Sequence, residues 1–440
     1  MKIAQFYQSF NRLKKDGSKL LVLADQALMS GGNFILGLVL IRLLGLEQYG
    51  LFALLWMGVL FALSLHQAFI TKPLMTLAIG QKEEIQHNYF HVLWKMQFFF
   101  GSSLVLLLSG LTYLGTRFLE TPNWVKFVPL IALITFCYLL QDFIKKTFFI
   151  KKDYGKPLVI DGLNYSLLFS GLYYLHFTEN ASLKPILICM GMSYLVSTFL
   201  YSKRLCLKNK TAETSTYGDL LKKHYHFSNW LLGTSILQWF SGNFFLIAAA
   251  STLGTTAVGA VRMAQNLVGL CHILFLAMEN IVPAEAAQLF LQKNNKILAK
   301  YLVNIGLKIG AIALLILSVM AIAAPNLIHW IYGASFVAYS YVVWGYCLLY
   351  IFVYMGYPLR YFFRTIQFTR PIFIAYCFST FFSLTVAFPI VQYWGITGLL
   401  IGLILSQIIT LLVYIYFIGE KIIDFKSSNG AKYDNLGCQP

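Results

Sequence analysis

Charged residues are scarce in this sequence. Only 12% of its 440 residues are Asp, Glu, Lys or Arg, whereas soluble domains carry roughly 25%. Hydrophobic residues make up 58% of the chain, and the mean hydropathy is +0.67. These values exclude a soluble protein. They indicate a polytopic membrane protein with no sizeable soluble domain.

Motifs of several enzyme classes are also missing. The sequence contains no P-loop, no HExxH motif and no GxSxG motif. Its seven cysteines form no CxxC or Cys/His pattern with metal-ligand spacing, so we expect neither a metal site nor a disulfide framework. We therefore expect that the protein is not an enzyme and binds no cofactor.

Twelve apolar segments are long enough to cross a bilayer, which takes about 20 residues. They are 20–44, 49–71, 92–114, 127–144, 157–177, 185–202, 227–251, 256–282, 301–324, 337–357, 371–391 and 395–418. The sequence therefore predicts an all-α polytopic membrane protein with about 12 transmembrane helices.

The basic residues predict the orientation in the membrane. Most of the 34 Lys and Arg residues fall in the termini and in one set of connections, including the Lys-rich connection 145–156. The opposite connections hold only Arg117, Lys126 and Lys184. By the positive-inside rule, both termini are expected in the cytoplasm. This bias also explains the net charge of +17, so no nucleic-acid partner is expected.

We predict two lobes of six helices each. The expected order is a cytoplasmic segment 1–19, an N-terminal lobe 20–202, a cytoplasmic linker 203–226, a C-terminal lobe 227–418 and a cytoplasmic tail 419–440.

The start of each lobe repeats one sequence pattern. Gly32-Asn33-Phe34, Leu44-Gly45, Gly50 and Pro73 recur as Gly242-Asn243-Phe244, Leu253-Gly254, Gly259 and Pro283. Because six is an even number of spans, both copies enter the membrane in the same orientation. The pattern therefore predicts parallel repeats, and the polar residues described next predict a central cavity.

Polar side chains form stripes inside the apolar segments. Polar residues in such positions either join helices or line a hydrated cavity. A charged residue at depth needs a partner or a cavity, because burying its charge costs at least a few kcal/mol. The residues expected to line the cavity are Gln26, Ser30, Asn33, Asn164, Asn229, Asn243, Gln265 and Asn266. Asp161 and Tyr165 lie on the same helix face as Asn164.

Several motifs resemble a known family. They are Asp25-Gln26-Ala27, Ser30-Gly31-Gly32-Asn33-Phe34, Leu43-Leu44-Gly45, Gln48-Tyr49-Gly50-Leu51-Phe52, Pro325-Asn326-Leu327-Ile328 with Tyr332-Gly333, and Gly395-Ile396-Thr397-Gly398. Together they resemble oligosaccharide (Wzx-type) flippases of the multidrug/oligosaccharidyl-lipid/polysaccharide exporter superfamily.

The resemblance implies a flippase that works by alternating access. Its cargo would be an oligosaccharide linked to undecaprenyl pyrophosphate, moved from the inner to the outer leaflet of a bacterial inner membrane. The product would be O-antigen, capsule or exopolysaccharide. A polysaccharide polymerase and chain-length machinery are the expected partners.

Charged residues in or near the spans supply the expected site. We expect Arg262, Lys308 and Arg42 to contact the phosphates of the headgroup. Asp25, or else Glu279, would bind the proton or sodium ion whose gradient drives the cycle.

Three alternatives are open. A lipid-linked peptidoglycan precursor flippase is one, but such relatives commonly carry extra helices, for which twelve spans leave no room. A cation-coupled multidrug exporter would share the fold, although it favours an acidic cavity and the deep charges here include more cations than anions. A membrane polysaccharide polymerase or acyltransferase is a different class, and such enzymes typically use large external loops that this chain lacks.

Overall fold

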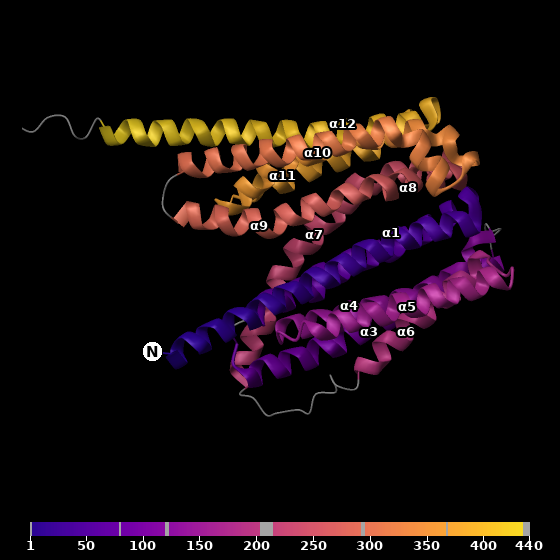
Figure 1. Cartoon of the computed structure of the whole chain (residues 1–440), viewed down its shortest axis with the longest axis horizontal. Coiled ribbons are helices and arrows are strands. Elements are labelled where there is room, and N and C mark those ends of the chain that lie inside the picture. Colours follow the sequence, from indigo (N-terminus) through magenta and orange to yellow (C-terminus); the bar gives the residue numbers. More distant parts are fainter. Residues whose placement is uncertain are drawn as a thin grey trace, which may run out of the picture. The chain divides into compact units, whose positions relative to one another are not determined.

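The computed structural model describes residues 2–78, 81–118, 123–202, 214–291, 295–366 and 368–433. Within these ranges the chain is almost entirely helical and contains no strand, which confirms the predicted all-α fold (Figure 1). In chain order the elements are α1 (Lys2–His66), η1 (Gln67–Thr71), α2 (Lys72–Leu77), α3 (Glu83–Phe118), η2 (Asn123–Phe127), α4 (Val128–Ile150), α5 (Gly155–Phe177), α6 (Leu183–Ser202), α7 (Thr214–Thr252), α8 (Thr255–Val268), η4 (Gly269–Cys271), α9 (His272–Leu291), α10 (Asn295–Ile331), η5 (Ala334–Tyr339), α11 (Ser340–Thr365) and α12 (Arg370–Tyr433).

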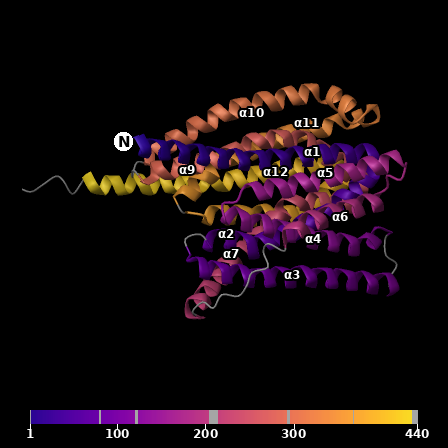
Figure 2. The same ribbon diagram turned by 60° about the horizontal axis from the view of Figure 1, so that its bottom comes forward.

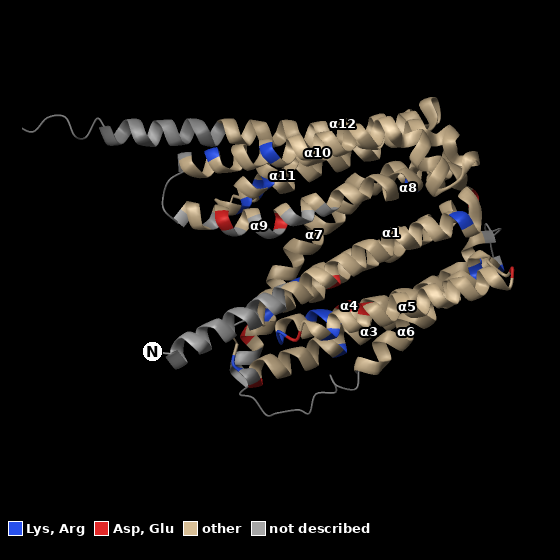
Figure 3. Cartoon of the chain, in the orientation of Figure 1, with Lys and Arg blue, Asp and Glu red and all other residues tan. Residues whose placement is uncertain are grey.

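The twelve predicted spans all lie on helical residues. The first two share α1 and the last two share α12. Among the described residues, eight helical stretches are long and apolar enough to cross a membrane. Large apolar side chains face outward, such as Leu106 at 73% and Ile322 at 83% exposure. Figure 3 shows few charged residues, mostly near helix ends. This surface suits acyl chains, and the protein is a multi-pass membrane protein.

The sequence repeat corresponds to a repeated backbone conformation. Gly45 interrupts α1 with φ 71° and ψ 173°, and its counterpart Gly254 precedes α8 with φ 85° and ψ −178°. Only glycine adopts such angles without strain. The two copies therefore turn the chain in nearly the same way between their first and second predicted spans.

The chain forms two compact units, residues 1–236 and 237–440, and α7 belongs to both. Its first part packs on residues of unit 1. His224 Nε2 donates to the Phe69 carbonyl at 2.8 Å, and Tyr89 Oη lies 2.6 Å from His224 Nδ1. Its second part packs within unit 2, where Thr380 Oγ1 donates to the Leu237 carbonyl at 2.8 Å.

The predicted lobe boundaries stay predictions. Residues 203–213 of the expected linker lie outside the described residues, and residues 214–226 begin α7. Met1 and residues 434–440 of the expected terminal segments also lie outside the described residues.

The predicted connections were too long, because the helices extend into them. We expected a loop at 145–156, but α4 continues to Ile150 and α5 begins at Gly155. Lys145 is therefore a helical residue, with only 8% exposure. The prediction was wrong because it used lysine as a sign of solvent. An ion pair keeps this lysine inside the helix bundle of unit 1. The matching connection in unit 2, residues 366–369, is equally short.

The glycine turn of α1 gives a first prediction. In the variant Gly45→Ala we expect a loss of about 1 kcal/mol or more in the free energy of unfolding, because alanine must adopt a positive φ. Gly58→Ala in the same helix is the matched control. No neighbouring atom lies within 4 Å of an added Cβ at either position.

Thermal unfolding of both variants in detergent measures the difference. Gly58→Ala should unfold at the wild-type temperature or higher, because alanine favours the helix. Equal midpoints for the two variants would show that the Gly45 turn does not require glycine.

Candidate functional site

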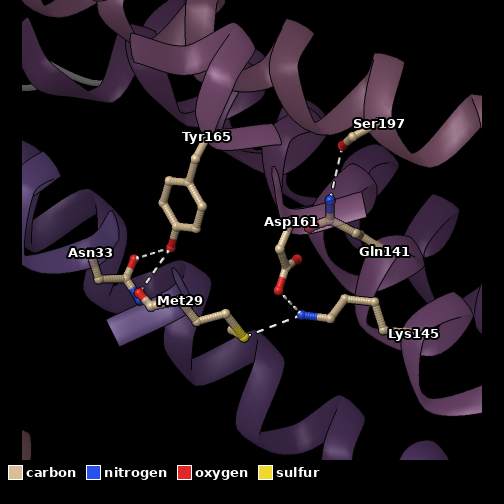
Figure 4. Close-up of polar contacts among 7 residues, drawn as sticks. All are labelled: Met29, Asn33, Gln141, Lys145, Asp161, Tyr165 and Ser197. Carbon is tan, nitrogen blue, oxygen red and sulfur yellow. Dashed lines mark hydrogen bonds and ion pairs between the residues drawn. The ribbon is translucent and has the colours of Figure 1, made fainter. Parts of the chain in front are cut away.

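A buried acid–base cluster joins α1, α4 and α5 in unit 1. Asp161 of α5 and Asp25 of α1 are 4% and 2% exposed. The Lys145 ammonium of α4 forms an ion pair with Asp161 and also donates to Met29 Sδ at 3.2 Å (Figure 4). The carboxyl groups of Asp25 and Asp161 are close enough to interact with each other. Two acids thus share one base inside an apolar unit.

Asp25 is the member of this cluster with an unused acceptor. Its Oδ1 atom is buried and has no hydrogen-bond partner among the described residues. If both acids are ionised, Lys145 balances only one of the two negative charges. A buried, uncompensated carboxylate is costly, so a proton or a small cation at Asp25 would stabilise the cluster.

A second group of contacts lies beside it on α1 and α5. The Tyr165 hydroxyl is 3.0 Å from Asn33 Oδ1 and 3.2 Å from the Met29 carbonyl (Figure 4). The two helices approach closely here because Gly32 has no side chain. A Cβ at Gly32 would lie 2.6 Å from the Tyr165 ring. The Gly32-Asn33 motif therefore positions α5 against α1.

Sequence reasoning missed some polar residues of unit 1. Lys145 was assigned to a loop, and Asp161 was noted without a role. Asp142 of α4 was not considered; its carboxylate lies 3.7 Å from His66 Nδ1 and 3.4 Å from Thr71 Oγ1. No sequence signal distinguishes Lys145 from a loop lysine, because its burial depends on how α4 packs against α5.

The principal polar group of unit 2 surrounds Arg262 on α8. Its Nη1 atom donates to Gln265 Oε1 at 2.6 Å, and its Nη2 atom donates to Asn243 Oδ1 of α7 at 3.4 Å. Asn266 donates to the Tyr332 hydroxyl at 3.4 Å. The side chains of Asn243, Arg262, Gln265 and Asn266 are partly exposed, whereas Tyr332 is buried. Three of the predicted cavity residues, Asn243, Gln265 and Asn266, thus lie at or next to the predicted phosphate ligand.

Tyrosines of α11 add hydroxyl groups near this arginine. Tyr346 and Tyr350 lie within electrostatic range of the Arg262 guanidinium. They belong to a stripe with Tyr354, Tyr357 and Tyr361 on one face of α11. The stripe was missed in the sequence because tyrosines in an apolar span resemble ordinary core residues.

The other predicted site residues are not brought into these clusters. Gln26, Asn229 and Lys308 are exposed, as is Arg42, and Ser30 is partly buried. Asn164 is buried at 4% exposure, and its Oδ1 atom has no hydrogen-bond partner among the described residues. Glu279 of α9 forms a half-exposed ion pair with Arg364, with Oε1 and Nη1 at 3.6 Å. Among the described residues no group of three His, Cys, Asp or Glu side chains could hold a metal ion.

A sequence model of a family described as "Polysaccharide biosynthesis protein" matches residues 39–341, which is more than half of the chain. The chain belongs to this family. No curated protein matches it.

Solved structures with a similar fold are transporters. An inward-facing multidrug resistance MATE family transporter of the MOP superfamily is 15% identical, with a TM-score of 0.69 over 93% of this chain and 96% of the other. The lipid II flippase MurJ in an inward closed conformation is 14% identical, with a TM-score of 0.66 over 91% and 87%. A MOP superfamily transporter from Pyrococcus furiosus is 15% identical, with a TM-score of 0.56 over 90% of both chains. At these low identities the structural similarity shows the fold, and together with the family match it agrees with the resemblance seen in the sequence.

The buried ion pair of this polysaccharide biosynthesis protein gives a second prediction. Lys145→Met leaves two buried acids without a base, and Asp161→Leu leaves a buried ammonium. We expect each single variant to lose about 3–5 kcal/mol of stability. The double variant should recover most of the loss, because it removes both charges. Thermal unfolding of the three variants checks this.

Lys156→Met is the matched control. Lys156 at the start of α5 pairs with Asp153 of the short α4–α5 connection, and the two side chains are 31% and 40% exposed. Exposed pairs contribute about 1 kcal/mol or less, so only a small change is expected. If Lys145→Met proved as mild as Lys156→Met, the cluster would be hydrated in solution.

Proposed function

We propose that this protein is a flippase for a lipid-linked oligosaccharide. The cargo is carried on undecaprenyl pyrophosphate and moves by alternating access from the inner to the outer leaflet of a bacterial inner membrane. There it feeds the biosynthesis of a surface polysaccharide. A polysaccharide polymerase and chain-length machinery would use the product. Both termini are placed in the cytoplasm under this proposal.

The observation that carries the proposal is the Arg262 group within an apolar helical unit of a polysaccharide biosynthesis protein. A diphosphate headgroup cannot cross hydrocarbon unaided, because losing its hydration costs many kcal/mol. A guanidinium binds phosphate oxygens with two parallel hydrogen bonds. The amides of Asn243 and Gln265 and the nearby tyrosine hydroxyls can exchange hydrogen bonds with sugar hydroxyls. The group thus suits both parts of the headgroup.

Of the predicted phosphate ligands, Arg262 fits best. It is partly buried and held by two amides, whereas Lys308 and Arg42 are exposed side chains. Long exposed cations in a span can extend toward the headgroup region instead. We keep Lys308 and Arg42 only as secondary contacts of the phosphates during the transport cycle.

Energy coupling belongs to unit 1 in this proposal. Asp25 has the buried, unpartnered carboxylate oxygen that a proton or sodium ion would occupy. Glu279 is the weaker candidate, because it is half-exposed and already pairs with Arg364. An ion gradient is then the only energy source required.

A multidrug exporter is the second candidate. The buried acids Asp25 and Asp161 favour it, since a cationic drug needs a carboxylate partner. Against it, Lys145 already pairs with Asp161, and the polar group of unit 2 is centred on a cation. The two functions differ in the charge of the cargo, so one assay separates them.

The headgroup site gives a third prediction. Purified protein in liposomes should move a fluorescent diphosphate-linked oligosaccharide lipid to the outer leaflet. An impermeant quencher removes the fluorescence of the lipid there, so the loss of fluorescence measures flipping. We expect Arg262→Ala to slow flipping by about 10-fold or more, because one charge-assisted contact to phosphate is lost. Arg262→Lys should retain part of the rate, since it keeps the charge but not the fork.

Lys300→Ala, an exposed charge on α10, should flip at the wild-type rate. A wild-type rate for Arg262→Ala would remove Arg262 from the mechanism. Export of a cationic dye without any flipping of the lipid would favour the multidrug exporter.

The coupling site gives a fourth prediction. We expect an imposed proton or sodium gradient to accelerate flipping by the wild-type protein. The variant Asp25→Asn should flip lipid at the rate that the wild type shows without a gradient. A gradient should not accelerate it, because the amide cannot bind and release the ion. Glu47→Gln, an exposed acid of the same helix, is the control and should respond like the wild type. An unchanged response of Asp25→Asn would move the coupling site elsewhere.

A further inference from the structure

A second basic group lies at the end of α11, away from Arg262. Arg360 stacks on Tyr357, with its guanidinium carbon 4.3 Å from the ring centre. It also lies within electrostatic range of the hydroxyls of Tyr376 and Tyr414 on α12, which runs beside α11 (Figures 1 and 2). Among the described residues, no carboxylate is within 4.0 Å of Arg360.

An acid that interacts with the same tyrosines as Arg360 is already engaged. Glu279 of α9 pairs with Arg364, which lies one helical turn after Arg360 on the same face. Arg360, Arg364 and Glu279 together therefore carry one net positive charge. The excess charge attracts an anion.

Two tyrosine hydroxyls beside Arg360 are buried and have no partner. Tyr361 and Tyr414 are 1% and 0% exposed, and neither Oη atom has a hydrogen-bond partner among the described residues. Both lie within electrostatic range of Arg360. Buried hydroxyls are almost always hydrogen-bonded. An anion with several acceptor oxygens would satisfy the guanidinium and both hydroxyls together.

We propose that Arg360, Tyr361 and Tyr414 form a second anion site, and that its ligand is the phosphate group of a membrane lipid. Phosphate suits the site because arginine binds its oxygens in pairs. A lipid suits it because the neighbouring surface of α12 is apolar and exposed, as at Ile415 (56%) and Tyr416 (71%). Acyl chains would cover that surface while the headgroup reaches Arg360. The site requires only that the chain spans a membrane, so it stands apart from the proposed flippase function.

The new site is separate from the Arg262 group. Arg262 interacts with Tyr346 and Tyr350, and Arg360 follows Tyr350 by ten residues on the same helix. Ten helical residues correspond to a rise of about 15 Å. The two guanidinium groups therefore interact with tyrosines on different turns of α11.

Two lipids could supply the phosphate, and they are distinguished by titration. Native mass spectrometry of the full chain, purified in detergent, would use phosphatidylglycerol, undecaprenyl pyrophosphate and diacylglycerol, which has no phosphate. We expect both phosphate lipids to bind more tightly than diacylglycerol. Tighter binding of phosphatidylglycerol identifies a bulk membrane lipid, and tighter binding of undecaprenyl pyrophosphate identifies a lipid carrier; either result supports the site.

Arg360→Gln should weaken binding of the phosphate lipids by about 10-fold or more. Arg370→Gln is the matched control, because it removes an exposed arginine at the start of α12. The proposal is overturned if the two variants weaken binding equally, since binding would then reflect diffuse charge. It is also overturned if diacylglycerol binds as tightly as the phosphate lipids.

Tyr414→Phe keeps the test decisive if Arg360→Gln does not fold. Without added lipid, this variant should unfold at the wild-type temperature or higher, because it removes an unpartnered buried hydroxyl. Phosphatidylglycerol should stabilise it less than it stabilises the wild type. A variant that is destabilised without lipid, and equally stabilised by it, would show that Tyr414 has an internal partner and contradict the site.

Discussion

The hydrocarbon interior of a bilayer offers no hydrogen bonds, and both units of this protein are built under that constraint. Helices satisfy the backbone internally, so a break in a helix needs a residue that tolerates it. Gly45 and Gly254 provide such breaks at matching places of the repeat. Charged side chains obey the same rule. Lys145 remains within α4 because Asp161 faces it, and Arg262 remains within α8 because two amides accept its hydrogen bonds. Where the rule is not met, as at the Asp25 carboxylate, a bound ion is the simplest remedy.

The same constraint explains how far the sequence could predict the fold. The length of an apolar segment is visible in the sequence, and all twelve predicted spans fall on helices. The repeated glycine pattern predicted the repeat, and Gly45 and Gly254 have similar backbone angles. The polar contacts were harder. Arg262 and Gln265 were predicted to lie on one helix face, and Asn243 was predicted only to line the same cavity from another span. The contact between Arg262 and Asn243 was not predicted. The pairing of Lys145 with Asp161 was not predicted, because it depends on which faces of α4 and α5 meet. Composition marks lysine as a loop residue, and only packing shows that it is buried.

The two units differ in the charge that they bury. Unit 1 holds two acids and one base around Asp161, whereas the polar group of unit 2 is centred on Arg262. In a single mixed cluster, the carboxylates would repel an anionic headgroup and the guanidinium would repel a coupling cation. Under the proposed function, separate clusters let each ligand meet only the opposite charge. The two copies of the repeat share the turn at Gly45 and Gly254, but their polar contacts differ. Asn33 accepts a hydrogen bond from Tyr165, whereas its counterpart Asn243 accepts one from Arg262.

The two arginines of unit 2 that are proposed to bind phosphate, Arg262 and Arg360, stand in environments that imply different ligand lifetimes. Arg262 is held by amides that can also bind a sugar, and these contacts are easily exchanged because they are neutral and partly exposed. Arg360 is fixed by stacking on Tyr357 and flanked by hydroxyls that are fully buried. A preorganised, desolvated site binds phosphate more tightly and releases it more slowly. Rapid exchange suits a group through which cargo passes at every cycle. Slow exchange suits a lipid that stays, so the geometry favours a resident phospholipid at Arg360 over a moving cargo.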